Sequence, residues 1–424
     1  IPPMSSPHSS CPHSGRSRWL LLFLSLLIGD VSLASADREE PRGLVEARLL
    51  LMKDVARYKW HHQRPIEDLA RERVVLKHAR SDALRHGLDV DSYAAFMNAQ
   101  INAAKVIQQY WFRRWQRGHA PTVGPDLTTE LRPELITLGE RIAQSLSAPD
   151  RDRSPAMTSI KVVGLDRSTM ENLITALSSV QIYAHRLDQV LSSQTLRIGT
   201  TGDYAPFSFA ADALSTESQT FQGIDIDLAR DLARSLNVQP VFIKTSWPTL
   251  MDDLKNGHFD VGMSGVSRTI SRSHVAFFSQ PYHRGGKTPI ARCTDRERFS
   301  SLTAIDQPGV RVIVNPGGTN ERFTRQLTQA SIRVFGDNTT IFDEIIEDRA
   351  DVMFTDLIEV RLQTSRQPTL CSTMSAPLTY QEKAILMTQD LRLKEVVSTW
   401  LDQRLGDGTV QSLFDRHMNT SERP

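Results

Sequence analysis

The chain has 424 residues, of which 40% are hydrophobic and 23% charged, as in ordinary globular proteins. This length predicts about two to three domains at roughly 150 residues each. The formal net charge of +1 gives no support for a nucleic-acid partner or for binding to an acidic surface.

The N-terminal segment has the pattern of a secretory signal peptide rather than of a folded domain. Arg16 and Arg18 precede an apolar run over residues 19–28, and small residues follow as far as Ala36. A membrane anchor is the alternative, but the run is too short, because about 20 residues are needed to span a bilayer. We therefore expect residues 1–36 to be a signal peptide, cleaved after Ala36, that directs the chain to the periplasm.

The cysteines fit an exported protein. The chain has three, and Cys11 would leave with the signal peptide. Cys293 and Cys371 remain, an even number in an oxidising compartment, which favours a disulfide bond between them. Two unpaired cysteines in the core are the alternative. No later stretch is long and apolar enough to span a membrane, so we expect no membrane association after cleavage.

Residues 37–192 predict an all-helical domain, because Gly and Pro are sparse and apolar residues recur at helical spacing. Pro65, with Glu67 and Asp68 in the following turn, predicts the start of a helix. Gly87 predicts a helix end. Later helices are expected to begin at Asp89 or Asp91, near Thr128, and near Ser168 with an end at about Leu191.

Residues 193–424 predict an α/β domain, because strand and helix patterns alternate along the chain. The expected strands are 195–200, 241–243, 259–263, 310–314, 332–335 and 351–354. The expected helices begin near 223, 249, 320 and 341.

Charged and polar side chains recur at particular positions of the helical domain. Taken singly, each is best explained as part of a solvated face with salt bridges. As a set, four segments resemble the secreted subclass of the all-helical chorismate mutases. These segments are 48–53, 55–59, 65–72 and 100–108.

The chorismate mutase resemblance implies an arginine clamp for the carboxylates of the substrate. Arg48 and Arg71 belong to the matching segments, and one more arginine is expected to complete the clamp. Arg132 is our choice, and Arg141 is the alternative. Bidentate arginine–carboxylate bonds would fold a flexible dianion into one reactive conformer.

The same resemblance implies that Lys59 and Gln108 donate hydrogen bonds to the breaking ether oxygen, on which negative charge develops. Asp68 and Glu72 would orient the Arg and Lys side chains and the substrate hydroxyl. Gln108 is neutral, so the mutase rate should not fall steeply above neutral pH. The rearrangement is unimolecular and needs no nucleophile, so we expect no metal and no cofactor.

Polar residues follow the predicted strand at 259–263. The order Ser264, Gly265, Ser267 and Arg272 resembles the polar amino-acid solute-binding proteins of the periplasm. The resemblance implies a two-lobed, type II periplasmic-binding-protein fold, with the ligand between the lobes. The two serines and the glycine would supply hydrogen bonds, and Arg272 would hold a carboxylate. The strands that cross between the lobes are expected near 283–288 and 377–383.

Motifs in the second half of this domain look like those of the cyclohexadienyl dehydratases, at 286–289, 314–323 and 355–363. The resemblance implies that Glu359 is the general acid, which protonates the ring hydroxyl as prephenate loses carbon dioxide. Glu359 must then stay protonated near neutral pH, which requires a desolvated or anion-rich pocket. Without the motif, a surface helix residue would be the simpler interpretation of Glu359.

The dehydratase resemblance also implies a set of substrate contacts. They are Arg272 and Thr319 at the pyruvyl carboxylate, Lys287, Asn315 and Asn320 at the ring and hydroxyl, and Asp203 and Trp247 shaping the pocket from the first lobe. Lys287 is further expected to take part in catalysis.

Taken together, the two resemblances predict an exported bifunctional enzyme that converts chorismate to prephenate and prephenate to phenylpyruvate. Arogenate, which would give phenylalanine, is a further candidate substrate. The alternative is a chorismate mutase fused to a non-catalytic solute-binding or sensing domain. The expected partners are small molecules, and a homodimer is expected only by analogy with the helical mutases.

Overall fold

The structure is a computed structural model, and it describes residues 40–118, 120–147, 160–210 and 221–418. The predicted signal peptide over 1–36 lies outside the described residues. Within the described ranges, no helix has both the length and the apolar character needed to cross a bilayer.

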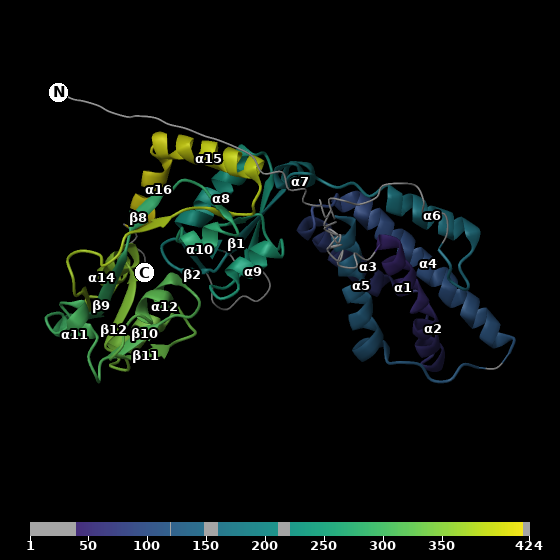
Figure 1. Cartoon of the computed structure of the whole chain (residues 1–424), viewed down its shortest axis with the longest axis horizontal. Helices are drawn as coiled ribbons and strands as arrows, with labels where there is room; N and C mark the ends of the chain where they lie inside the picture. The colour runs from purple at the N-terminus through teal and green to yellow at the C-terminus, as the bar shows by residue number, and fades with distance from the viewer. Residues whose placement is uncertain (1–39, 119, 148–159, 211–220, 419–424) are drawn as a thin grey trace, which may run out of the picture. The chain divides into compact units, whose positions relative to one another are not determined.

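The N-terminal part of the described chain is entirely helical (Figure 1). Its elements are α1 (Pro41–Leu50), α2 (Met52–His61), α3 (Leu69–Arg85), α4 (Val90–Gln116), the π-helical turn η1 (Leu127–Leu131), α5 (Arg132–Leu146), α6 (Arg167–Ser178) and α7 (Arg186–Ser193). Leu49, Tyr93, Phe96 and Ile142 are fully buried in a core of its own. Leu187 and Val190 of α7 pack instead into the core of the α/β region that follows.

The start of α3 differs from the prediction. A helix was expected to begin at Pro65, but it begins at Leu69. Asp68 is its N-cap, and the Asp68 carboxylate accepts a hydrogen bond from the backbone N–H of Arg71 at 2.9 Å. A side-chain acceptor at the N-cap satisfies an amide that the helix itself cannot pair, which fixes the first turn at this position.

The single helix expected from about Ser168 to Leu191 is in fact two helices, α6 and α7. The segment between them is extended, because it pairs with the turn before α4. Tyr183 donates its backbone N–H to the Gly87 carbonyl at 2.8 Å, and Leu88 and Ile182 form an antiparallel bridge. These long-range bonds replace the helical ones over residues 179–185.

The first lobe of the α/β region is built on a sheet of order β5-β1-β6-β15-β7 in the described chain. Strand β1 runs parallel to β5 and β6, and β15 runs antiparallel to β6 and β7. The elements of this lobe are β1 (Thr195–Thr200), β2 (Asp203–Tyr204), β3 (Ser208–Ala210), β4 (Phe221–Gln222), α8 (Ile224–Ser235), β5 (Gln239–Lys244), α9 (Leu250–Lys255), β6 (Val261–Gly262), α10 (Ile270–Ser273), β7 (Phe277–Phe278), β15 (Leu386–Met387), α15 (Leu391–Gly406) and α16 (Thr409–Met418).

The second lobe is built on a sheet of order β11-β10-β12-β9-β13. Strand β10 is parallel to β11 and β12, and β9 is antiparallel to β12 and β13. The elements of this lobe are β9 (Lys287–Arg292), η2 (Cys293–Asp295), α11 (Leu302–Ile305), β10 (Arg311–Val314), α12 (Thr319–Thr324), β11 (Ser331–Val334), α13 (Ile341–Ile346), β12 (Val352–Asp356), α14 (Leu357–Arg366) and β13 (Leu370–Ser372). A disulfide bond between Cys293 and Cys371 joins η2 to β13.

Two short antiparallel strands connect the lobes. They are β8 (His283–Gly285) and β14 (Gln381–Lys383), which lie at the two crossings expected from the sequence. Each crossing strand therefore brings side chains to the line where the two sheets face each other.

Candidate active sites

The helical region encloses a cavity of about 710 Å³. Side chains from α1 to α5, with the loop before α3, line it. All seven residues predicted for the mutase site line this cavity, together with the apolar Met52, Val55 and Leu135: Arg48, Lys59, Asp68, Arg71, Glu72, Gln108 and Arg132. Arg141, the alternative clamp residue, does not line it, so the geometry favours Arg132.

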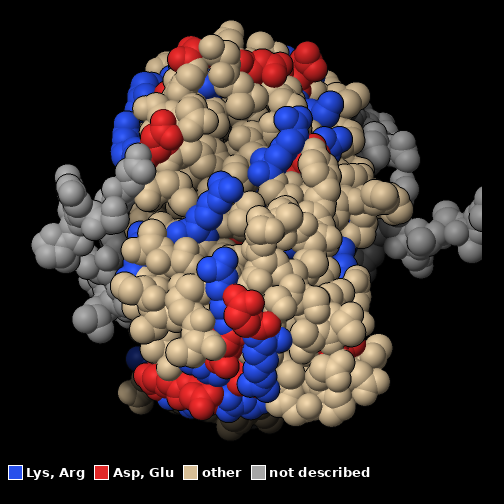
Figure 2. Space-filling view, turned by 90° about the vertical axis from the view of Figure 1, so that its left-hand side faces the viewer, with Lys and Arg blue, Asp and Glu red and all other residues tan. Residues whose placement is uncertain are grey.

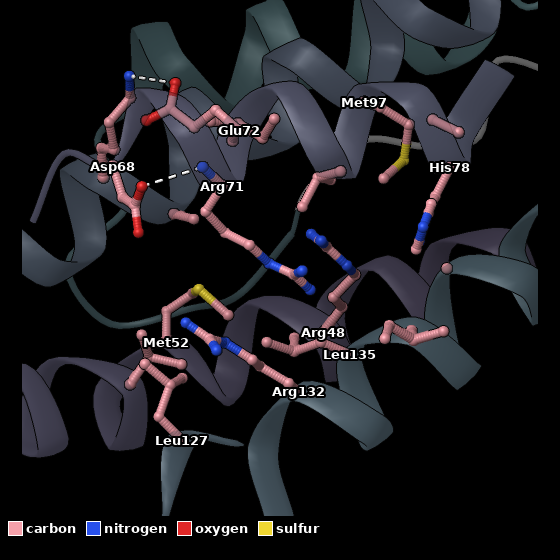
Figure 3. Close-up of a pocket in the computed structure, with 18 of the residues that line it drawn as sticks. Arg48, Met52, Asp68, Arg71, Glu72, His78, Met97, Leu127, Arg132 and Leu135 are labelled. Carbon is pink, nitrogen blue, oxygen red and sulfur yellow. Dashed lines mark hydrogen bonds and ion pairs between the residues drawn. The ribbon is translucent and has the colours of Figure 1, made fainter. Parts of the chain in front are cut away.

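Four of these side chains are cations that form no close ion pair, although Asp68 and Glu72 line the same cavity. Among the described residues, no carboxylate lies within ion-pair distance of Arg48, Lys59, Arg71 or Arg132. Figure 3 shows the guanidinium groups of Arg48, Arg71 and Arg132 pointing into the same part of the cavity. Burial and the neighbouring Arg132 lower the pKa of Arg71. Cations held together without directly paired carboxylates favour an anionic ligand.

Arg48 is the most deeply buried of the four cations. Its Nη1 donates a hydrogen bond to Gln100 Oε1 at 3.2 Å, and its Nε is buried without a partner in the described chain. Burial lowers the pKa of Arg48. The unused donor is available to a bound carboxylate.

Lys59 and Gln108 each keep donor capacity for a ligand. Lys59 Nζ donates one hydrogen bond, to the Ile66 carbonyl at 2.7 Å, out of the three that an ammonium group can make. Gln108 Nε2 donates to the Ala104 carbonyl at 3.1 Å, and its second hydrogen faces only the weak thioether acceptor Met52 Sδ at 3.9 Å. Burial lowers the pKa of Lys59, and nearby Asp68 acts in the opposite direction.

The two predicted acids have defined partners. Asp68 caps α3, as described above, and Glu72 Oε2 accepts a hydrogen bond from Lys105 Nζ at 3.2 Å. Lys105 also contacts Glu67 at 3.2 Å. Sequence reasoning missed Lys105 as the partner of Glu72, although its spacing on α4 places it one turn before Gln108.

The second candidate site lies between the lobes of the α/β region. In the structure it is a cavity of only about 20 Å³. Seven of the predicted residues line it: Trp247, Gly265, Ser267, Arg272, Asn315, Thr319 and Asn320. Tyr204, Asn338, Asp356 and Lys383 line it as well, and none of these was predicted. A six-carbon ring does not fit in this volume, so the lobes must separate for such a ligand to enter.

The first lobe contributes Arg272 and the loop after β6. Arg272 Nη1 donates to the Ser267 carbonyl at 2.9 Å, and burial lowers the pKa of Arg272 to about 10. Gly265 has φ +63°, and a Cβ there would lie 2.5 Å from the Phe207 ring, so only glycine fits. Its N–H donates to Asp225 Oδ2 at 2.6 Å, which fixes the loop.

Four predicted residues are not on the cavity wall: Ser264, Asp203, Lys287 and Glu359. Ser264 Oγ lies 2.7 Å from Thr201 Oγ1 inside the first lobe. Asp203 is largely buried, which raises the pKa of its carboxyl, and its backbone carbonyl accepts a hydrogen bond from Asn338 Nδ2 at 2.8 Å. Lys287 is fully buried behind the wall. Their roles toward a ligand stay predictions.

A cluster of buried charges forms part of the cavity wall and extends behind it. Asp356 Oδ1 accepts a hydrogen bond from Lys287 Nζ at 2.7 Å, and Asp356 Oδ2 accepts one from Lys383 Nζ at 2.6 Å. Tyr204 donates its hydroxyl to Asp356 Oδ2 from the first lobe. Lys383 also donates to Ser267 Oγ at 3.0 Å. The cluster therefore links the lobes through one carboxylate.

Glu359 adjoins this cluster. Its carboxyl is 2% exposed and accepts a hydrogen bond from the Thr355 hydroxyl. Asn320 Nδ2 donates to Asn315 Oδ1 at 2.9 Å and to Thr355 Oγ1 at 3.2 Å, which connects Glu359 to the cavity wall. Burial raises the pKa of Glu359 to about 8, and the charge of Asp356 raises it too. A carboxylic acid in this position is protonated at neutral pH.

The surface of the molecule carries charge of both signs. Figure 2 shows Lys and Arg side chains in a diagonal row over the middle of one face, with Asp and Glu mainly toward its two ends.

Within the described ranges, no group of three or more His, Cys, Asp and Glu side chains is arranged to hold a metal ion.

Comparison with known proteins identifies both regions. Residues 196–420 match the sequence profile of the bacterial extracellular solute-binding proteins, family 3. The chain belongs to this family. Residues 43–109, ahead of the family-3 region, match the profile of chorismate mutase type II. The fold class predicted from the sequence, an all-α domain followed by a two-lobed α/β domain, is therefore confirmed.

Relatives of the family-3 region include an enzyme. The chain is 47% identical over 230 residues to a cyclohexadienyl dehydratase of Pseudomonas aeruginosa, covering 54% of this chain and 84% of the relative. It is also 29% identical over 167 residues to a monofunctional chorismate mutase of Enterobacter agglomerans, covering 38% of this chain and 92% of the relative. Both sequence resemblances are confirmed.

Among solved structures, the family-3 region is similar to the ancestral amino acid-binding protein AncCDT-1, described as a precursor of cyclohexadienyl dehydratase. The TM-score is 0.50 at 31% identity, and the match covers 55% of this chain and 99% of that chain.

Proposed function

We propose that this protein is a bifunctional enzyme that converts chorismate to prephenate in its helical domain and prephenate to phenylpyruvate in its α/β domain. One observation carries the proposal. A chain 47% identical to a cyclohexadienyl dehydratase has, beside its interlobe cavity, the buried carboxyl group of Glu359, and burial raises the pKa of that group to about 8. The product of the first reaction is the substrate of the second, so each assignment supports the other.

The proposed mutase reaction needs positioning and charge stabilisation, and no nucleophile. Arg48, Arg71 and Arg132 would bind the two carboxylates and hold chorismate in its reactive conformer. Lys59 and Gln108 would donate to the ether oxygen as the C–O bond breaks, because Lys59 has spare donors and Gln108 would give up only a weak contact with Met52 Sδ. The four cations of the cavity, none of which is paired directly with a carboxylate, suit a dianion.

The proposed dehydratase reaction needs one proton. Glu359 would donate it to the ring hydroxyl, which leaves as water, while the C–C bond to the ring carboxylate breaks and carbon dioxide departs. The electron pair of that bond completes the aromatic ring of phenylpyruvate. Arg272 and Thr319 would hold the pyruvyl carboxylate. Lys287, Asn315 and Asn320 would hold the hydroxyl and the ring against the acid.

We further propose that the chain is exported to the periplasm, with residues 37–192 and 193–424 as its two mature domains. The relatives named histidine-binding periplasmic protein, at 26% identity, support this location. The disulfide bond between Cys293 and Cys371 supports it as well, because such bonds persist in oxidising compartments. Arogenate as a further substrate and a homodimer remain proposals of the same kind.

The test is to incubate the purified chain with prephenate and measure phenylpyruvate. Turnover that disappears in Glu359→Gln, while chorismate consumption continues, is the expected result. Binding of prephenate without turnover would instead favour a solute-binding or sensing domain. Lys59→Ala should stop chorismate consumption without affecting prephenate turnover, and unchanged consumption would refute the mutase assignment.

A further inference from the structure

Asp356 occupies the N-cap position of α14 but does not cap that helix. An aspartate at an N-cap normally accepts a hydrogen bond from an amide of the first turn. In the part of the chain that the structure describes, other N-cap aspartates do so, namely Asp68, Asp89, Asp126, Asp166 and Asp390. The Asp356 carboxylate is therefore engaged by something other than its own helix.

Buried donors from three other elements take both oxygens of this carboxylate. Lys287 of β9 lies 2.7 Å from Oδ1, Lys383 of β14 lies 2.6 Å from Oδ2, and the Tyr204 hydroxyl of β2 donates to Oδ2. The Lys287 side chain is 0% exposed and that of Lys383 5%. Two buried ammonium groups thus share one counter-ion, and a buried charge without a partner is costly.

Glu359 lies one helical turn beyond Asp356 on α14, against the same cluster. The charged groups that face it are Asp356 on its own helix, Lys287 on β9 and Lys383 on β14, and the Tyr204 phenol of β2 adjoins them. A negative charge nearby favours the protonated form of a carboxyl group, and positive charges favour the ionised form. The two lysines and Asp356 therefore act on Glu359 in opposite directions.

Resting on the dehydratase reaction proposed above, we propose that Asp356 is a positioning residue for that reaction. Its carboxylate holds Lys287 and Lys383 in place and offsets their positive charge, so that Glu359 retains the proton it must deliver. Without Asp356, the lysines would favour ionised Glu359, which cannot act as an acid. With Asp356 present, Lys287 and Lys383 can interact with the substrate while Glu359 stays protonated.

The test compares pH profiles of kcat/KM for prephenate in the full-length chain, with the uncatalysed rate subtracted. In the wild type, activity should fall as pH rises through the pKa of Glu359. In Asp356→Asn, the midpoint of this fall should move to lower pH by about one unit. In Lys383→Met, which removes a positive charge, the midpoint should move to higher pH. Asp356→Glu should bring the midpoint back toward the wild-type value.

Opposite shifts in the two variants cannot come from a general loss of structure, which would lower activity without moving the midpoint. Asp390→Asn is the matched control. Asp390 caps α15 and is not among the charged groups that face Glu359, so the same substitution there should leave the midpoint unchanged. Midpoints that coincide in wild type, Asp356→Asn and Lys383→Met would overturn the inference. If Asp356→Asn fails to fold, an upward shift in Lys383→Met supports the inference, and an absent or downward shift overturns it. A wild-type chain that makes no phenylpyruvate overturns the proposed function itself, which separates the two failures.

Discussion

Replacing Lys59 by methionine should slow chorismate rearrangement strongly and leave the fold intact. Methionine has a similar length and keeps the packing of the alkyl chain, but it has neither charge nor hydrogen-bond donors. Lys59 lines the 710 Å³ cavity and gives only one of its hydrogens to the protein, at Ile66. The partly buried Ile66 carbonyl can bond to water instead, so the loss falls mainly on the ligand.

The size of the effect follows from the kind of contact that is lost. A preorganised donor aimed at developing negative charge contributes about 3–4 kcal/mol, which corresponds to roughly 100- to 1000-fold in kcat. Chorismate consumption, followed by its absorbance, measures kcat and KM separately. Lys77→Met is the control, because Lys77 is an exposed residue of α3 that does not line the cavity. A fall in kcat of less than tenfold, or an equal fall in the control, would refute the assignment of Lys59.

Further predictions concern the clamp, the acid and the disulfide. Arg132→Ala should raise KM for chorismate by roughly 10- to 100-fold, as expected for lost charged hydrogen bonds. Arg141→Ala should leave KM near the wild-type value. A larger effect of Arg141→Ala than of Arg132→Ala would make Arg141 the clamp residue. The dehydratase rate should fall as pH rises through about 8, where Glu359 loses its proton, and a rate that stays constant well above that pH would contradict its role as the acid. Changing both Cys293 and Cys371 to serine should destabilise the second lobe by about 4 kcal/mol, because the bond closes a loop with a sequence separation of 78; an unchanged urea midpoint would count against this.

Much of the fold could be predicted because its elements carry strong local patterns. The strand expected at 195–200 is β1, and the one expected at 310–314 contains β10. The strand expected at 259–263 is shorter, with only Val261 and Gly262 in β6. The strands β2, β4, β7 and β15 have only two residues each. A strand of this length is too short to show an alternation of apolar and polar residues, so these four could not be predicted. The start of α3 was placed too early because Asp68, the capping residue, looked like a first-turn acid.

The candidate site residues could be named where a segment carries the motif of a known family. Arg48, Lys59 and Gln108 are an example, because their segments resemble the chorismate mutases, and all three line the cavity. The cluster around Asp356 was missed, because Tyr204 is 152 residues away and comes from a two-residue strand. One signal in the sequence could have indicated Lys383, because this lysine lies on a strand expected to cross between the lobes, next to the ligand site. Its burial, however, depends on contacts that only the folded lobes create.

The small volume between the lobes has a consequence for the reaction cycle. In the proposed reaction, Glu359 would give up its proton at each turnover. Glu359 is only 2% exposed, so solvent would have little access to replace that proton while the lobes are closed. Separation of the lobes would withdraw Tyr204 from Asp356 and let water reach the second lobe. Each opening would therefore let Glu359 regain its proton as well as exchange product for substrate. A chain locked shut around bound prephenate should complete a single turnover.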